Sequence, residues 1–418
     1  MNGREQLNQA LNHKEGKVPV DFGSLPVTGI HCSVVEQLRK HYGLEERPIK
    51  ICEPFQMLGL IEEDLKQAMG VTVEGIYPRN VMFGFPMGDW KEWRAPWGQD
   101  LLVPGEFNVT RDDENNYYLY PEGDTSLAPS GRLPDGGYFF DAVIRQEHFD
   151  EDNLNAEDNL QEFNALSEED LEHFRRSVAD VSGRGRGVIA NMGGTGLGDI
   201  ALVPGLNLKD PRGIRDVEEW YVSTVIRQDY LHEIFDKQTD IALENLGRVK
   251  DIFGETVQAI FLCGTDLGTQ DSTFCSNETF DELYKPYYKK MNDWIHKNTT
   301  WKSVKHTDGA IFDLIPHLID AGFDVLNPIQ TSARGMDPKR LQEAYGDRIV
   351  FWGGSADSQH TLPFGTPEAV RKEALTNCEI LAQGGGYVFN SIHNIQARTP
   401  IANVIALVDA VHEFNGDR

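Results

Sequence analysis

The feature that most constrains this chain is a unit in which a short apolar run ends in polar residues and a helical pattern follows. In the best example an apolar run reaches His306, turns over Asp308 and Gly309, and continues into apolar residues spaced three and four positions apart. That spacing predicts an amphipathic helix. Gly322 ends the helix, and a second apolar run then leads to Asn327. The segment is therefore predicted to be a strand, a helix and a strand, with polar groups where each strand ends.

The same unit recurs along the chain and sets the predicted architecture. Five consecutive apolar runs in the C-terminal part end in polar residues, and three earlier runs are candidates for further strands. The runs lie at Val18 to Phe22, Thr72 to Tyr77, Val188 to Asn191, Ala259 to Cys263, Val304 to His306, Phe323 to Leu326, Ile349 to Trp352 and Tyr387 to Asn390. Strand-then-helix units in this number predict an α/β fold, a (β/α)8 barrel of the TIM type, better than an open doubly wound sheet. The glycines from Gly193 to Gly198 lack the spacing of a dinucleotide-binding fingerprint.

A different pattern occupies residues 89–140. Aromatic residues there alternate with Pro and Gly, which is typical of β-hairpins. We expect a β-rich insertion near the barrel mouth, within a single barrel domain that spans residues 1–418. The insertion could cover the site as a lid, or its tryptophans could form only the core of a small hairpin cluster. Upstream, the apolar positions between Cys52 and Met69 predict a further helix.

Composition excludes several classes of partner. The formal net charge of the 418 residues is −27, so nucleic-acid phosphates and anionic membrane surfaces would be repelled. No apolar run approaches the roughly 20 residues of a membrane span, and Met1 to Glu5 begin no signal peptide. We therefore expect no nucleic acid and no membrane as partners, and a cytoplasmic location. The five cysteines are widely spaced without a C-x-x-C pair, which predicts reduced thiols.

Several segments together resemble the uroporphyrinogen decarboxylase superfamily. They are Arg4 to Leu7 followed by Val18 to Val20, Gly264 to Gly268, His306 to Gly309, Gly322 to Pro328, and Thr399 to Asn403. The resemblance is strong over residues 250–412 and thin before them. It implies a TIM barrel with one of two activities. One branch of the superfamily decarboxylates uroporphyrinogen without a cofactor, and the other comprises corrinoid-dependent methyltransferases with zinc at the barrel mouth.

Particular residues separate these two branches. The decarboxylases carry an Arg-Gln-Ala-Gly-Arg segment after the first strand, because several substrate carboxylates need guanidinium partners. The corresponding segment here, Phe22 to His31, contains no arginine, which disfavours porphyrinogen decarboxylation. The methyltransferases bind zinc through a His-x-Cys-Gly turn and a later cysteine. Here Asp308 follows His306 in that turn, and His393 stands in the place of the late cysteine. The resemblance implies that these three residues are catalytic and could hold zinc through nitrogen and oxygen ligands.

Further polar residues near the predicted strand ends are candidate substrate ligands: Asp266, Gln270, Asn327, Gln330 and Asp357. Each has a structural alternative, since such residues commonly cap loops or satisfy turn amides. The same holds for His306, which could be a hydrogen-bonded acid with Asp308 as its orienting partner instead of a metal ligand. Cys263 is expected to be a buried strand residue.

Together with these residues, the resemblance implies a corrinoid-dependent methyltransferase of the O-demethylase type. It would take a methyl group from a small methylated compound, such as a methoxylated aromatic, and pass it to the cobalt of a separate corrinoid-binding protein. Replacing two thiolates hardens the metal site, which favours an oxygen-bearing donor. One alternative is a cofactor-free decarboxylase of another carboxylated ring, with Arg79, Arg334 and Arg398 as candidate cations. The other is a non-catalytic barrel that binds a small ligand.

Overall fold

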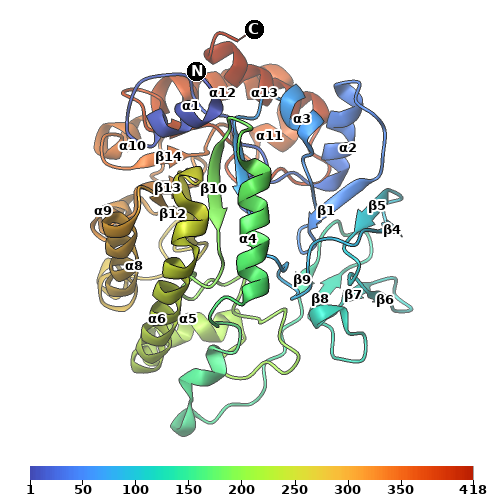
Figure 1. Ribbon diagram of the computed structural model, residues 1–418, viewed down its shortest axis with the longest axis vertical. Helices are drawn as coiled ribbons and strands as arrows, with labels where there is room; N and C mark the ends of the chain where they lie inside the picture. The colour runs from blue at the N-terminus through green and yellow to red at the C-terminus, as the bar shows by residue number, and fades with distance from the viewer. Residues whose placement is uncertain (418) are drawn as a thin grey trace.

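Seven parallel strands form the central sheet of the structure, a computed structural model in which residues 1–417 are described. Along the sheet the order is β3, β10, β11, β12, β13, β14 and β15 (Figure 1). Their bounds, in that order, are Val73–Ile76, Gly187–Asn191, Ala259–Cys263, Lys302–His306, Val325–Asn327, Val350–Trp352 and Tyr387–Val388. Every neighbouring pair is parallel and in sequence order, as crossover helices on one side of a barrel require.

The predicted first strand closes this sheet into a ring between β15 and β3. It is not a regular strand, but Val20 forms a parallel bridge with Phe389. The N–H of Asp21 donates to the carbonyl of Phe389 (2.9 Å), and the N–H of Thr72 donates to the carbonyl of Val20 (2.9 Å). All eight predicted strand positions are therefore occupied around one barrel, and the TIM-type fold is confirmed.

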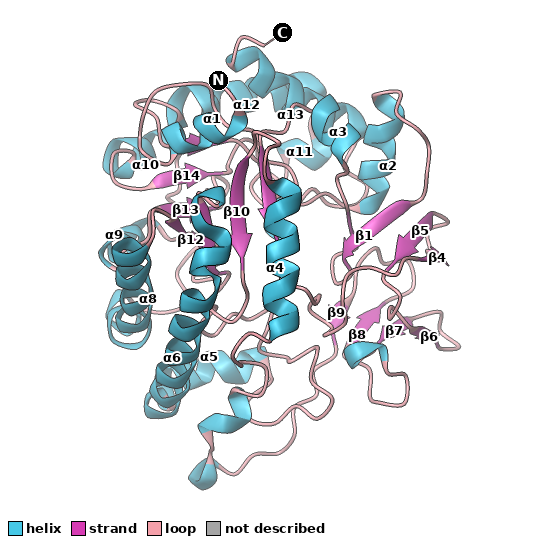
Figure 2. Ribbon diagram, in the orientation of Figure 1, coloured by secondary structure: helices cyan, strands magenta, loops and turns pink. Residues whose placement is uncertain are grey.

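Helices cover the outside of the barrel (Figure 2). Several begin at caps that the sequence supplies: Ser167 and Asp170 form a reciprocal capping box at the start of α4, while Asp216 and Thr366 cap α5 and α12. The α-helices beyond the first are α2 (Cys32–His41), α3 (Glu63–Ala68), α4 (Glu168–Val181), α5 (Val217–Ile226), α6 (Gln228–Phe253), α7 (Asn277–Thr279), α8 (Lys285–Asn298), α9 (Ile315–Asp320), α10 (Pro338–Tyr345), α11 (Thr361–Phe364), α12 (Pro367–Leu381) and α13 (Ile401–Phe414).

Helix α1 (Gly3–Ala10) packs at the amino-terminal end of the barrel. Leu7 and Leu11 belong to the same apolar cluster as the inward-facing residues of the strands, which are Val73, Ile189, Ala259, Val304, Val325, Val350 and Val388. A Cβ at Gly187 would lie 2.5 Å from Leu7, so only glycine permits this approach of helix and strand. Both termini lie at this end in Figure 1, and the strand ends that carry the polar residues point the other way.

The segment from residue 89 to 140 is β-rich, as predicted. It contributes β4 (Lys91–Arg94), β5 (Asp100–Val103), β6 (Val109–Arg111), β7 (Tyr117–Leu119) and β8 (Gly131–Leu133), and β9 (Asp141–Ala142) follows directly. Antiparallel pairing joins β4 to β5 and links β6 through β9 in sequence. Strand β5 also pairs in parallel with β1 (Ile49–Glu53), so the hairpins are attached beside the barrel rather than projecting freely (Figure 1).

The predicted helix between Cys52 and Met69 is wrong for most of its length. Only α3 is helical there, and β2 (Leu58–Gly59) pairs with β1 before it. The carboxylate of Glu53 accepts the N–H groups of Phe55 (2.9 Å) and Gln56 (2.7 Å), which stabilises a tight loop in place of a helical turn. Within the described residues, no helix is long and apolar enough to cross a membrane.

Candidate active site at the barrel mouth

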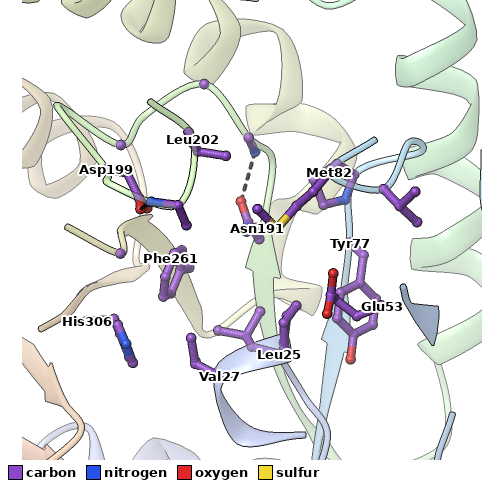
Figure 3. A pocket seen from close by; sticks show the side chains of 18 of the residues that line it. Leu25, Val27, Glu53, Tyr77, Met82, Asn191, Asp199, Leu202, Phe261 and His306 are labelled. Carbon is purple, nitrogen blue, oxygen red and sulfur yellow. Dashed lines mark hydrogen bonds between the residues drawn. The ribbon is translucent and has the colours of Figure 1, made fainter. Parts of the chain in front are cut away.

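A cavity of about 470 Å³ opens at the carboxyl ends of the strands. Its walls are largely apolar, with Leu25, Val27, Met82, Leu202 and Phe261 among the side chains drawn in Figure 3. His306, His393 and Asp266 also line it. A small-molecule site in a TIM barrel is expected at this end, and the volume is typical of one.

His306 at the end of β12, Asp308 in the turn after it and His393 in the loop after β15 come together here. One ligand atom from each lies within 4.8 Å of the others, a spacing that a single metal ion could bridge. Nε2 of His306 is 3.3 Å from Oδ2 of Asp308, and the rings of His306 and His393 have centroids 5.4 Å apart. The structure thus brings together all three residues predicted to be catalytic.

The orientation of His306 is fixed by Asn327 on the neighbouring strand. The side-chain N–H of Asn327 donates to the carbonyl of Trp352 (3.0 Å), which turns its Oδ1 toward Nδ1 of His306 at 2.7 Å. An amide oxygen can only accept, so Nδ1 carries a proton and Nε2 is directed toward Asp308. Two acceptors that face each other at 3.3 Å repel unless a cation lies between them, either a proton or a metal ion.

The pKa values of this pair follow from their contact. Burial acts to lower the pKa of His306, but the hydrogen bond and charge of Asp308, together with the charge of Asp266, raise it above its usual value. Burial acts to raise the pKa of Asp308, and the bond from His306 with the nearby His393 brings it below its usual value. Both residues are therefore stabilised in their charged forms.

The turn that carries Asp308 is held by two of the predicted polar residues. Oδ1 of Asp266 accepts the N–H of Asp308 (2.9 Å), and Oε1 of Gln330 accepts the N–H of Gly309 (2.6 Å). Gly309 has φ +101° and its Cα faces the backbone of Gly268, where a Cβ would lie 2.3 Å from a carbonyl carbon. This turn therefore depends on glycine and on hydrogen bonds from adjacent loops.

Sequence comparison places the C-terminal half of the chain in a known family. Residues 211–414 match the family model of uroporphyrinogen decarboxylase (URO-D). Residues 211–414 therefore belong to the uroporphyrinogen decarboxylase superfamily. A uroporphyrinogen decarboxylase from Psychromonas ingrahamii is 33% identical over 98 residues, which are 23% of this chain and 26% of that protein. One from Anaeromyxobacter sp. is 27% identical over 188 residues, 44% of this chain and 48% of that protein. The matched region thus spans a quarter to a half of the curated relatives' length.

The fold of the whole chain, and not only of its C-terminal half, matches a solved structure. The methyltransferase from Methanosarcina mazei superposes with a TM-score of 0.55 and 16% sequence identity, covering 99% of each chain. At this level of identity the likeness concerns the fold. It includes the N-terminal part, where the superfamily resemblance in sequence is thin.

Not every predicted substrate ligand reaches the cavity. Asp266 lines it, whereas Asn327, Gln330, Gln270 and Asp357 do not. Gln270 is exposed, and its carbonyl accepts the N–H of Arg334. Asp357 caps the backbone of Gln359 (2.7 Å) and contacts Nδ1 of His360 at 2.9 Å. These residues thus make positioning contacts, and a role in substrate binding stays a prediction.

Cys263 lies at the outer face of its strand, as expected for a buried structural residue. Its Sγ contacts the hydroxyl groups of Thr265 (2.8 Å) and Tyr288 (2.7 Å). The three arginines considered for a decarboxylase do not line the cavity either. Arg79, for example, pairs with Asp170 at 3.0 Å.

Three carboxylates that sequence reasoning missed do line the cavity: Glu162, which pairs with Arg215, and Glu53 and Asp199, which are labelled in Figure 3. Burial raises the pKa of Glu53 to about 7 against the opposing effect of its two backbone N–H donors. Burial also raises the pKa of Asp199, which the N–H of Ala201 and the charge of Lys305 oppose. Asp199 follows the glycine-rich run after β10, and that run could have signalled a close approach of backbone to ligand. Glu53 was hidden inside a segment predicted to be helical.

Proposed function

We propose that this protein is the methyltransferase component of a corrinoid-dependent O-demethylation. It takes a methyl group from a small methoxylated compound and passes it to the cobalt of a separate corrinoid-binding protein. The observation that carries the proposal is the set of His306, Asp308 and His393, in which the two histidines line a largely apolar cavity and Asp308 contacts His306. The fold likeness to a methyltransferase is consistent with it.

The three side chains fit a metal ion in number, type and spacing. Imidazole and carboxylate are ordinary ligands of zinc, and the facing acceptors on His306 and Asp308 need a cation between them. A bound zinc would act as a Lewis acid toward the oxygen that leaves when the methyl group departs. Because thiolates are absent from this set, the ion should be held less tightly than in a cysteine-rich zinc site.

The chain's own residues have defined tasks in this proposal. Asn327 holds the proton on Nδ1 of His306 and so keeps Nε2 available to a metal or to a second proton. Without a metal, the proton between Nε2 of His306 and Oδ2 of Asp308 would be the one that passes to the leaving oxygen, so the two residues would act together as the acid. Cobalt(I) on the partner is the nucleophile, so the barrel needs none. Its tasks are to orient the donor and to exclude water.

The cavity wall argues against the decarboxylase alternative. Among the described residues that line the cavity there is no arginine or lysine, whereas Glu53, Glu162, Asp199 and Asp266 all line it. A substrate with several carboxylates would meet negative charge there without a guanidinium or ammonium partner. A methyl ether needs no such partner.

A paired assay tests the proposal. Purified protein is analysed for metal and incubated with methoxylated aromatics and a reduced corrinoid, and methylation of cobalt is followed by its absorbance spectrum. We expect methylcobalt to form with release of the free phenol. Release of carbon dioxide from a carboxylated ring, with no methylcobalt from any ether, would support the decarboxylase instead.

A further inference from the structure

Glu53 is a buried carboxylate at the wall of the cavity, and the reaction proposed above does not use it. The side chain sits at the end of β1 with 5% of the residue exposed. Its two oxygens each accept one backbone N–H, from Phe55 and from Gln56. Each carboxylate oxygen has capacity for a further hydrogen bond, so the group is held in place but not saturated.

No cation of the described chain neutralises this carboxylate. Of the four acidic residues that line the cavity, Glu162 pairs with Arg215 at 2.7 Å, and Asp266 accepts the N–H of Asp308 at 2.9 Å. Glu53 forms no ion pair among the described residues, and neither does Asp199. A buried carboxylate without a counter-ion is costly to ionise, and a bound cation would remove that cost by supplying the missing partner.

The position of Glu53 separates it from the proposed reacting groups. In Figure 3, Glu53 and Tyr77 lie on one side of the cavity, and His306 and Asp199 lie on the other. Between them lie the apolar side chains of Leu25, Val27 and Met82, together with the amide of Asn191. The hydroxyl group of Tyr77 donates to the carbonyl of Gly23, which leaves the ring as the part that can contact a ligand.

We propose that Glu53 binds an ammonium group of the methyl donor, at the side of the cavity away from His306. This inference rests on the proposed function, because that function is what makes the bound ligand a methyl donor. It restricts the methyl donor to compounds that carry a positive charge. A protonated or methylated amine matches the unpaired carboxylate in charge, and its alkyl groups match the apolar wall. The ring of Tyr77 can add a cation–π contact. A chain with net charge −27 would also attract a cation toward the barrel mouth.

Binding of matched probes tests this without any turnover. Isothermal titration calorimetry compares three compounds of similar shape. They are choline, its uncharged isostere in which a tert-butyl group replaces the trimethylammonium group, and an anion in which the tert-butyl group is attached to a carboxylate. We expect choline to bind the wild-type protein about tenfold or more tightly than the uncharged isostere, and the anion not to bind. Equal affinity for all three, stronger binding of the anion, or no binding of choline would overturn the proposal.

Two variants then locate the site. Glu53→Gln keeps the size of the side chain and should bring the preference for choline close to unity, while affinity for the uncharged isostere and the melting temperature report that the cavity is intact. Asp199→Asn is the matched control, because it removes the other unpaired carboxylate of the cavity and should leave the preference in place. Loss of the preference in Asp199→Asn but not in Glu53→Gln would place the cation elsewhere and reject the role of Glu53. If Glu53→Gln does not fold, the wild-type comparison with Asp199→Asn still decides.

These measurements are independent of the methyl-transfer assay. A protein that prefers the cation but methylates no corrinoid would retain the cation site and lose the proposed function. If the protein demethylates neutral ethers and shows no preference for the cation, the proposed function stands and the cation site at Glu53 is rejected.

Discussion

The two sides of the cavity treat buried charge in opposite ways. On one side His306 and Asp308 face each other, and each is stabilised in its charged form, with the pKa of the imidazole raised and the pKa of the carboxyl lowered. On the other side burial raises the pKa of Glu53 to about 7, and no cation among the described residues opposes it. The two sides are similarly buried, and they differ in whether the charged group has a partner of opposite charge. We refer to them below as the paired side (His306 and Asp308) and the unpaired side (Glu53).

This difference separates reaction from recognition. The paired side is complete within the chain and can present a proton or hold a metal before any ligand arrives. The unpaired side is incomplete until a ligand supplies positive charge. Variants on the paired side should therefore affect turnover most, and variants on the unpaired side should affect ligand choice and the pH dependence of stability.

The largest effect is expected from His306→Ala. Both versions of the reaction lose their central group, the metal ligand or the acid, so turnover should fall by about a thousandfold. Steady-state methylation of the corrinoid measures it. His296→Ala is the matched control, since His296 is a histidine on the outside of the barrel that contacts Asp324 at 2.7 Å. Wild-type turnover in His306→Ala would reject the paired side as the reacting site.

Asp308→Asn should distinguish the two possible mechanisms on the paired side, a bound metal ion or a protonated His306 as the acid. The amide cannot bind a metal as a carboxylate does, so metal content should drop to background, while a hydrogen bond to His306 can persist. If metal is required, turnover should fall about 100-fold together with metal content. Turnover that stays within about tenfold of wild type, in protein without metal, would favour the protonated imidazole.

A chelator gives an independent check on the same point. The residues that would hold an ion lie at the barrel mouth, outside the apolar core, so removal of a bound ion should leave the melting temperature nearly unchanged. Thermal unfolding with and without chelator measures this, with metal analysis of the same samples. A large drop in melting temperature would mean that the ion is structural.

How far sequence could predict this molecule depends on how local each signal is. The strand ends at His306 and Asn327 are visible because a period of apolar residues stops abruptly at a polar one, and parallel strands bring such ends to one edge. The hairpins after residue 89 were also readable from turn residues and aromatics. These features need only neighbours in the chain.

Residues that act through distant contacts were not readable. The task of Asn327 follows from its bond to the carbonyl of Trp352, and the task of Gln330 follows from the N–H of Gly309. Glu53 was missed because the apolar pattern there predicts a helix. Its carboxylate instead accepts two backbone N–H groups of the following residues, which stabilises a loop. In each case the deciding partner is a backbone group, which a sequence pattern does not identify.

A smaller effect on turnover is expected from Asn327→Ala. The variant frees the ring of His306 to change tautomer, so the fraction with Nε2 directed at Asp308 should fall and turnover should drop about tenfold, with little change in KM. The pH–rate profile is the decisive measurement, because loss of the acceptor at Nδ1 should lower the pKa seen in it. Asn292→Ala removes a buried asparagine that bonds the carbonyl of Ala321 at 2.7 Å and should leave the profile unchanged.

The last effect bears on the unpaired side and concerns stability instead of turnover. Because the pKa of Glu53 is about 7 in the folded protein against 4.5 in a free glutamate, the folded state holds a proton there that the unfolded state has released between those values. The contribution of Glu53 to the free energy of unfolding therefore becomes less favourable as pH rises from 4.5 to 7, by up to about 3 kcal/mol, and stays at that level above pH 7.

Glu53→Gln removes this titration, so the variant should gain stability relative to wild type on going from pH 5 to pH 8. Comparing the two proteins at each pH cancels other groups, including Asp21, whose pKa burial raises to about 6. Urea unfolding at both pH values measures the change, and choline should reduce it at pH 8 by pairing the ionised carboxylate. A difference between the two proteins that does not change with pH would show that Glu53 already has a partner for its charge.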